Sequence, residues 1–545
     1  MNRLLPSAAT LLMSIFILNY GLSQTTVSLK TENLKGPDQQ QLNNAYTNHK
    51  DWLHSSHDYS GQRYVDLRQI NISNVKKIRP IAIYQAGDTR GFHTSPLVYN
   101  GIMYLTTRYD AMAIDAITGR QLWRQTWNER KDAPSQSNRG LAIKEGVLFW
   151  GTGDGHLIAL NAATGAIAWK RQHAALGKGE KFNMSPLVYE NLVVIGTAGS
   201  ESGIQGWIAA YDITNGDEVW KFHIIPKPGD PAAATWGSDS ALIKAGGGVW
   251  TAATLDVESG LLFAGTADPA PVFDGRSRPG DNLYTNCLLA LDIRTGKLAW
   301  HKQMNPHDEL DRGVTSPGPI YSAVINGNKK QLIATAGKDG MVRVIDRITR
   351  QVLFETPVTT MLNATVSPSQ EGTRVCPGIL GGVQWNGISY NPNTNLIYAP
   401  AVDWCTTFKK GSDEESMLAP HMRKSNLGGA FKLDDVKESK GWLSAIDAST
   451  GKIKWQYASK TPMVAPATTT SGGLVLTGDN AGDFLVFNAA NGQLLYRFTT
   501  GGALAGGIVT YEINNKQYIA VTSGGMTSFW QKQGSSTVVI FSLQE

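Results

Sequence analysis

A short pattern that recurs seven times constrains the fold of this chain more than any other feature of its sequence. Each copy reads Asp/Asn-x-x-Thr/Asn-Gly-x-x-x-aromatic after a small apolar run. The Asp or Asn side chain can bond the amides of a turn, and Gly takes the positive φ that a tight turn demands. Arg350 replaces the Gly in one copy. The copies end at Trp123, Trp169, Trp220, Trp300, Phe354, Trp455 and Tyr496.

A strand-like run precedes each copy, such as residues 101–107 before the first and 146–152 before the second. Each unit is therefore a small antiparallel sheet, which cannot bury both of its faces alone. The gap of 101 residues between Phe354 and Trp455 leaves room for a further repeat, which we place at residues 383–401. Seven copies plus this repeat predict an all-β, eight-bladed β-propeller, because radial closure removes exposed sheet edges. A β-sandwich with chance Gly–Trp spacing is the alternative.

The repeats also decide how the 545 residues are divided, because small units can build one large domain. We expect residues 24–545 to form a single propeller domain. Residues 1–23 have the pattern of a signal peptide, with Arg3 at a positive start and the apolar stretch Leu11–Leu18 behind it. This stretch is shorter than the roughly 20 residues of a membrane span. The mature protein is therefore expected to be periplasmic or secreted, with a retained signal anchor as the alternative.

Charge and cysteine content limit the partners. The formal net charge is only +5 and no Lys/Arg run occurs, so nucleic acid is not an expected partner. Cys376 and Cys405 flank two strand-like runs, so a hairpin could bring them together in an oxidising compartment. Cys287 precedes an apolar strand and is expected to be a buried free thiol. The sequence contains no C-x-x-C-H, so this chain attaches no c-type haem of its own.

The repeat, with its Thr-Gly turn and closing Trp, resembles the tryptophan-docking motif of the quinoprotein dehydrogenases, the methanol and ethanol dehydrogenase family. Residues 52–78 resemble the opening segment of that family, and residues 472–498 and 507–525 resemble its closing blades. The resemblance covers nearly the whole mature chain. It implies a propeller that carries pyrroloquinoline quinone (PQQ) together with a metal ion, and a structural disulfide between Cys376 and Cys405.

The resemblance also implies which residues contact the cofactor. Arg139 in SNRG matches an arginine that binds a cofactor carboxylate, and Trp250 matches the tryptophan that stacks on the quinone. Lys338 in GKDG matches a basic residue near the quinone oxygens, and Asn183 and Gln384 match further positions that face the cofactor. A flat tricarboxylic quinone suits an aromatic floor and a bidentate Arg. Packing between blades for Trp250 and a hairpin tip for Lys338 are the competing interpretations.

Three carboxylates match the metal-binding positions of the family. Glu201 matches its metal-binding glutamate, Asp268 stands where an Asn is usual, and Asp311 matches the catalytic aspartate that also faces the metal. Hard divalent cations take carboxylate oxygens as ligands. Lanthanide-using relatives carry an aspartate where this chain has Gly313, so calcium is the expected metal. Solvated loops are the competing interpretation for Glu201 and Asp311.

Two departures from the family pattern bear on the site. The family usually places two adjacent cysteines just before the Asn-Arg-Gly segment, where this chain has Ala133 and Pro134. His93 stands where relatives commonly have Glu, and either alters the cofactor contacts or has a structural role. We therefore do not identify the chain as a methanol dehydrogenase.

The expected function is oxidation of an alcohol to the carbonyl compound. The alcohols considered include polyols and sugars. Asp311 takes the hydroxyl proton while hydride leaves the carbon. Electrons then pass to a separate carrier such as a cytochrome c. One alternative is a non-catalytic propeller like the outer-membrane assembly lipoprotein, although no lipobox Cys lies near Ser23. The other is a degenerate quinoprotein that binds the cofactor without turnover, an alternative suggested by His93 and Asp268.

Overall fold

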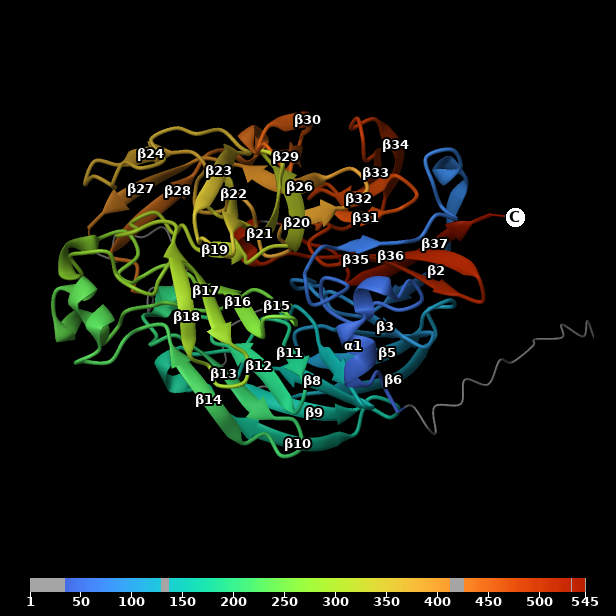
Figure 1. Cartoon of the computed structure of the whole chain (residues 1–545), viewed down its shortest axis with the longest axis horizontal. Coiled ribbons are helices and arrows are strands. Elements are labelled where there is room, and N and C mark those ends of the chain that lie inside the picture. Colours follow the sequence, from blue (N-terminus) through green and yellow to red (C-terminus); the bar gives the residue numbers. More distant parts are fainter. Residues whose placement is uncertain (1–34, 129–136, 412–425, 531, 545) are drawn as a thin grey trace, which may run out of the picture.

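The computed structural model describes residues 35–128, 137–411, 426–530 and 532–544 (Figure 1). The expected signal peptide, residues 1–23, and the pair Ala133 and Pro134 lie outside the described residues. Four-stranded sheets surround a central axis, and the first strands of the chain meet the last ones (Figure 1). One short helix, α1 (Gln39–Asn43), precedes the sheets. No helix in these ranges has the length and apolar character that crossing a bilayer requires.

The first four blades each consist of four strands in chain order. They are β3 (Leu97–Tyr99), β4 (Ile102–Thr106), β5 (Asp110–Asp115) and β6 (Gln121–Thr126); β7 (Ala142–Lys144), β8 (Val147–Gly151), β9 (His156–Asn161) and β10 (Ile167–Gln172); β11 (Leu187–Tyr189), β12 (Leu192–Gly196), β13 (Trp207–Asp212) and β14 (Glu218–His223); β15 (Thr254–Asp256), β16 (Leu261–Gly265), β17 (Cys287–Asp292) and β18 (Leu298–Gln303).

The next three blades follow the same plan with additions. They are β19 (Val314–Ser316), β21 (Asn328–Gly337), β22 (Met341–Asp346) and β23 (Val352–Pro357), with β20 (Ile320–Ile325) paired to β21; β25 (Ser389–Asn391), β26 (Leu396–Asp403), β29 (Lys440–Asp447) and β30 (Ile453–Ser459); β31 (Thr468–Thr470), β32 (Leu474–Gly478), β33 (Asp483–Asn488) and β34 (Leu494–Thr499), with β1 (Tyr64–Val65) parallel to β31.

Burial orders the strands within a blade. In the first blade every residue of β4 is buried, whereas β6 carries exposed and half-buried residues throughout. The fourth strand is therefore the outer one, and the first strand faces the axis. Apolar clusters fill the spaces between neighbouring sheets, as where Tyr104 and Trp150 pack together. Each blade thus buries both faces of its inner strands against its neighbours, as the repeats predict.

The predicted tryptophan docking is present. The ring of Trp220 lies against Gly296 of the next blade, and its Nε1 donates to Ile293 O at 2.9 Å. A Cβ on Gly296, whose φ is +69°, would lie 2.4 Å from the Trp220 ring. The turn glycine is therefore needed twice, for its left-handed backbone and for the space it leaves. The same contact of an aromatic ring with a turn glycine joins Trp123 to Gly165, Trp169 to Gly216, Phe354 to Gly451 and Trp455 to Gly492.

The eighth blade is not where the spacing placed it. Residues 383–401 contain β25 and most of β26, which share a sheet with β29 and β30 and so belong to the blade that ends near Trp455. The extra length of this region forms a separate sheet of β24 (Thr373–Val375), β27 (Thr406–Lys410) and β28 (Gly429–Leu433). The count of eight is right, but its assignment was wrong because the inserted sheet imitates a missing repeat.

The eighth blade joins the two ends of the chain. It consists of β35 (Ile508–Ile513), β36 (Lys516–Ser523), β37 (Thr537–Leu543) and β2 (Ile78–Gln85), which pairs antiparallel with β37. In Figure 1 the blue N-terminal segment lies beside the red C-terminal strands at this point. Because its outer strand comes from the other end of the chain, this blade has no turn and aromatic of its own at that position. The sequence motif therefore cannot identify it.

The cysteines behave as expected. Cys376 and Cys405 form a disulfide, directly after β24 and directly before β27, which are paired antiparallel. The bridge fastens the inserted sheet to the segment that leads to Gln384. Cys287, the first residue of β17, is a buried free thiol, and burial raises its pKa well above the usual value.

Candidate active site

The eight predicted site residues and His93 all lie in two kinds of loop. One kind leads into the first strand of a blade, and the other joins the second strand to the third. Because neighbouring strands are antiparallel, both kinds open at the same end of the propeller. Loops of the first kind carry His93, Arg139, Asn183, Trp250, Asp311 and Gln384, and loops of the second kind carry Glu201, Asp268 and Lys338.

The segment Gly246–Trp250 lies between two of these loops and is hydrogen-bonded to both. Gly248 N donates to Ser200 Oγ at 2.8 Å, and Gly247 N donates to the backbone oxygen of Asp268 at 2.9 Å. Glu201 follows Ser200 in a 3₁₀ turn, Ser200–Ser202. The backbone therefore brings Glu201, Trp250 and Asp268 to adjacent segments, although they come from different loops.

Asp268 and Asp311 form a pair of interacting carboxyl groups, of which Asp268 is buried and the Asp311 side chain is 19% exposed. Their side chains lie within hydrogen-bonding reach of each other. Burial, and then the charge of Asp311, raise the pKa of Asp268 well above its usual value. Burial also raises the pKa of Asp311, against the opposing effect of the Lys338 ammonium, which forms an ion pair with it. Two adjacent carboxylates in such a place need a cation to be ionised together.

Glu201 is held by Lys181, a lysine that no sequence motif marks. Lys181 Nζ lies 3.2 Å from Glu201 Oε1, and the Lys181 side chain is only 4% exposed against 43% for Glu201. Desolvation opposes ionisation of Glu201, but the Lys181 charge, hydrogen bonds and the Lys338 charge together outweigh it and lower the pKa of the carboxyl group. Glu201 still acts electrostatically on Asp268. The three carboxylates thus share one acidic region that contains two lysines.

The carboxylate oxygens of the acidic region are ligands that a hard cation prefers, but the three carboxyl groups are not gathered around one point. In the described part of the chain, no group of three or more His, Cys, Asp or Glu side chains is gathered as a metal site. Asp268 and Asp311 are together, whereas Glu201 faces Lys181. The donor set of carboxylate oxygens fits a divalent cation such as calcium. Asp311 also has φ +60°, which is uncommon for a residue other than Gly and often marks functional loops.

A second cluster combines Arg139 with aromatic rings. The Arg139 guanidinium lies 4.8 Å from the ring centroid of Trp250 and 5.1 Å from that of Trp385. Burial lowers the pKa of Arg139 to about 9, and its Nε has no hydrogen-bond partner among the described residues. A half-buried cation that forms no ion pair with a described carboxylate, beside two large flat rings, fits a planar anion. These features fit PQQ, which is flat and carries three carboxylates.

The remaining predicted contacts are placed less uniformly. Asn183 is buried beside the cluster, and its backbone oxygen accepts from Arg139 at 3.4 Å. Gln384 is buried, but its amide nitrogen donates to Leu380 O and Gly381 O at 3.0 and 2.9 Å. Its donor hydrogens therefore hold its own turn, and only its amide oxygen remains to face a ligand. Lys338 contacts the acidic region through Asp311.

Two residues of the site had no distinct signal in the sequence. Trp385 directly follows Gln384, yet it lies outside the repeat and no spacing marks it. Its ring packs in an aromatic cluster with Trp404 and Trp530, and Trp250 lies against that cluster. Lys181 lies two residues before Asn183, and only the fold of its loop turns it toward Glu201.

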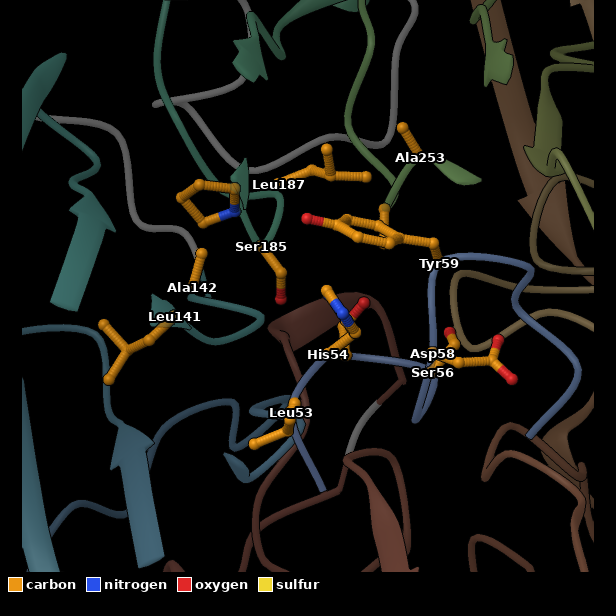
Figure 2. Close-up of a pocket in the computed structure, with 13 residues that line it drawn as sticks. Leu53, His54, Ser56, Asp58, Tyr59, Leu141, Ala142, Ser185, Leu187 and Ala253 are labelled. Atoms are coloured by element: carbon orange, nitrogen blue, oxygen red, sulfur yellow. The ribbon is translucent and has the colours of Figure 1, made fainter. Parts of the chain in front are cut away.

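A separate hollow lies between the N-terminal segment 53–59 and the inner strands of the second to fourth blades (Figure 2). Figure 2 shows His54 and Tyr59 from the N-terminal segment opposite Ser185, whose hydroxyl donates to the backbone oxygen of Arg139 at 2.7 Å. Burial lowers the pKa of His54 to about 4. None of the predicted site residues lines this hollow, so it is distinct from the candidate active site.

Comparisons with known proteins agree with this arrangement. Residues 52–366 match the family model described as "Glucose/ethanol/alcohol dehydrogenase, beta-propeller domain". A second model, for the outer membrane protein assembly factor BamB, matches residues 436–538, within the closing blades. The chain is 31% identical over 524 residues to the quinoprotein alcohol dehydrogenase PedH of Pseudomonas putida, covering 86% of each chain.

A quinohemoprotein alcohol dehydrogenase of Comamonas testosteroni is 31% identical over 543 residues, covering 90% of this chain and 76% of the relative. The crystal structure of the quinohemoprotein alcohol dehydrogenase from the same organism superimposes with a TM-score of 0.85 at 27% identity. That match covers 93% of this chain and 82% of the other. Both the sequence and the eight-bladed architecture therefore lead to one conclusion. This chain belongs to the family of PQQ-dependent alcohol dehydrogenases.

Proposed function

We propose that this chain oxidises an alcohol, polyol or sugar to the carbonyl compound with PQQ and one calcium ion. The observation that carries the proposal is the side-by-side arrangement of two chemistries at one end of the propeller. The neighbouring carboxyl groups of Asp268 and Asp311 support a cation, and the charge of Arg139 next to Trp250, which no described carboxylate pairs, supports a flat anion. This chain has Gly313 at the position where lanthanide-using members of the family carry Asp, and this difference favours calcium.

The residues that would hold the two groups follow from this arrangement. Trp250 would form the floor under the quinone ring, and Arg139 would bind one of its carboxylates. Asn183, Lys338 and Gln384 are assigned as further contacts to PQQ. The ligands of the cation would be Glu201, Asp268 and Asp311. When bound, PQQ supplies a two-electron acceptor, and the metal ion polarises it as a Lewis acid.

The chain itself contributes positioning and proton transfer. We assign to Asp311 the role of base, which takes the hydroxyl proton of the alcohol on a carboxylate oxygen as the C–H bond breaks. The ion pair with Lys338 fixes the orientation of this carboxylate and places a positive charge beside the oxygen that loses its proton. The rings of Trp250 and Trp385 keep water away from one side of the site.

The proposal extends to the cellular setting. Residues 1–23 would direct export and be removed, which leaves residues 24–545 as one propeller in the periplasm or outside the cell. Because the sequence contains no C-x-x-C-H motif, electrons would leave to a separate carrier such as a small cytochrome c.

Asp311→Asn tests the assigned base. The variant should still bind PQQ, because Arg139 and Trp250 are unchanged, but alcohol-dependent dye reduction should fall by roughly a hundredfold or more. Bound PQQ is measured by absorbance after gel filtration, and turnover by dye reduction with a panel of alcohols, polyols and aldoses.

Asp110→Asn is the matched control for this variant. Asp110 is buried and paired with Arg124 at 2.8 Å, and none of its side-chain partners is a predicted site residue. It should leave turnover unchanged. If Asp311→Asn turns over substrate as fast as the unmodified protein, the role of Asp311 is refuted. Loss of bound PQQ in Asp311→Asn alone would refute the separation between base and cofactor binding.

A further inference from the structure

A buried histidine without polar partners lies beside Arg139. His93 is 2% exposed, and neither ring nitrogen has a hydrogen-bond partner among the described residues. Its imidazole stacks on Trp385 with ring centroids 4.4 Å apart and planes inclined by 25°. The Arg139 guanidinium lies over the same Trp385 ring. The two side chains are thus fixed on one aromatic support.

Two neighbours of His93 strengthen this observation. Ser137 is also buried, and its hydroxyl has no partner within the described residues. Gly91 leaves the space between them open: a Cβ there would lie 2.1 Å from Ser137 Oγ and 3.4 Å from His93 Nε2. A buried polar group that lacks a hydrogen bond costs free energy, so several such groups around one point indicate a place that a ligand completes.

The charges around His93 decide which ligand fits. Burial, and then the nearby Arg139 cation, lower the pKa of His93 well below its usual value, so the free imidazole is neutral. A neutral imidazole has one N–H donor and one acceptor nitrogen. Arg139 keeps its charge, with no ion pair to any described carboxylate. An anion that accepts hydrogen bonds satisfies both side chains, whereas a cation would meet the Arg139 charge.

We infer that His93 donates a ring N–H to a carboxylate of bound PQQ, beside the contact that Arg139 makes with the cofactor. The two side chains then form a two-point carboxylate site. This inference rests on the proposed function. It assigns to His93 a direct cofactor contact in place of a structural role. It also predicts that the contribution of His93 depends on the carboxylates of the ligand and not on its ring.

The test compares PQQ with its trimethyl ester, which has the same ring system but no carboxylate. Each ligand is titrated with calcium into the purified mature chain, and binding is followed by quenching of tryptophan fluorescence. His93→Phe keeps a ring on Trp385 and removes both nitrogens. His173→Phe is the matched control, because His173 also stacks on a ring, Tyr211, at 3.9 Å, but bonds Gly216 O through Nε2.

His93→Phe should weaken PQQ binding at least tenfold, about 1.4 kcal/mol, and change ester binding by less than twofold. His93→Gln, which restores a donor, should recover part of the loss, and His173→Phe should bind both ligands like the unmodified protein. Circular dichroism reports whether the variants fold. Should His93→Phe not fold, His93→Leu, which also lacks a donor, is read in the same way.

The inference is overturned if His93→Phe binds PQQ as tightly as the unmodified protein. It is equally overturned if PQQ and the ester lose affinity alike, since that result assigns His93 to packing. Failure of the unmodified protein to bind PQQ at all would instead reject the proposed function, and the inference with it. The two failures are therefore separated by the unmodified protein alone.

Discussion

At the scale of single residues, the site is a balance between carboxylates and lysines. Asp311 is paired with Lys338, and Glu201 with Lys181. The two ammonium groups balance the negative charge of these carboxylates, as a bound metal ion would. If Glu201 is a ligand of the proposed cation, that cation must compete with Lys181 for it, so we expect Lys181 to affect metal affinity.

Lys181→Met tests this competition. The variant keeps an unbranched chain but removes an ammonium 3.2 Å from Glu201, so calcium should bind severalfold more tightly. Isothermal titration of calcium at constant ionic strength measures the change. Lys144→Met is the control, because Lys144 is a buried lysine that contacts the backbone of Glu190, outside the site. Equal or weaker calcium binding in Lys181→Met would refute the competition.

Individual site residues could be predicted only where they lie in a recognisable sequence motif. Arg139, Trp250 and Asp311 lie in short motifs that resemble those of the family, and the structure places each at the same end of the propeller. Lys181 and Trp385 were missed because their roles arise from how separate loops meet. No residue spacing encodes the contact of Lys181 with Glu201, since it depends on the turn at Ser200–Ser202.

At the scale of elements, the blade turn and its glycine join neighbouring blades. The turn that follows β17 places Gly296 under the Trp220 ring, and the indole N–H bonds the same turn. This contact needs a residue with no side chain and a left-handed backbone, and so the Asp-x-x-Thr-Gly pattern predicts it directly. The interface between blades was therefore predictable from one motif.

Gly296→Ala tests this interface. The added Cβ would lie 2.4 Å from the Trp220 ring at φ +69°, so the free energy of unfolding should fall by roughly 2 kcal/mol or more. Gly177→Ala is the control, because Gly177 has no atom within 4 Å of its Cβ position and lacks a positive φ. Denaturant titration compares the two. Equal stabilities would contradict the importance of the docking contact.

At the scale of the whole molecule, closure of the ring explains what the repeat count missed. The blade count came from local motifs, but the eighth blade pairs β2 with β37, from opposite ends of the chain. Pairing between segments that are more than 400 residues apart leaves no periodic signal. The inserted sheet of β24, β27 and β28 supplied a misleading gap instead. Architecture was thus predictable from the repeats, whereas the place of closure required the folded chain.

Closure of the ring is also what brings the loops of different blades to one site, where the central claim can be tested. Purified mature chain is titrated with PQQ and calcium, and the absorbance spectrum is recorded before and after addition of an alcohol. One equivalent of quinone should bind per chain, and a substrate alcohol should convert its spectrum to that of the reduced form. A chain that binds no PQQ, or whose bound quinone stays oxidised with every alcohol, polyol and aldose, would contradict the proposed function.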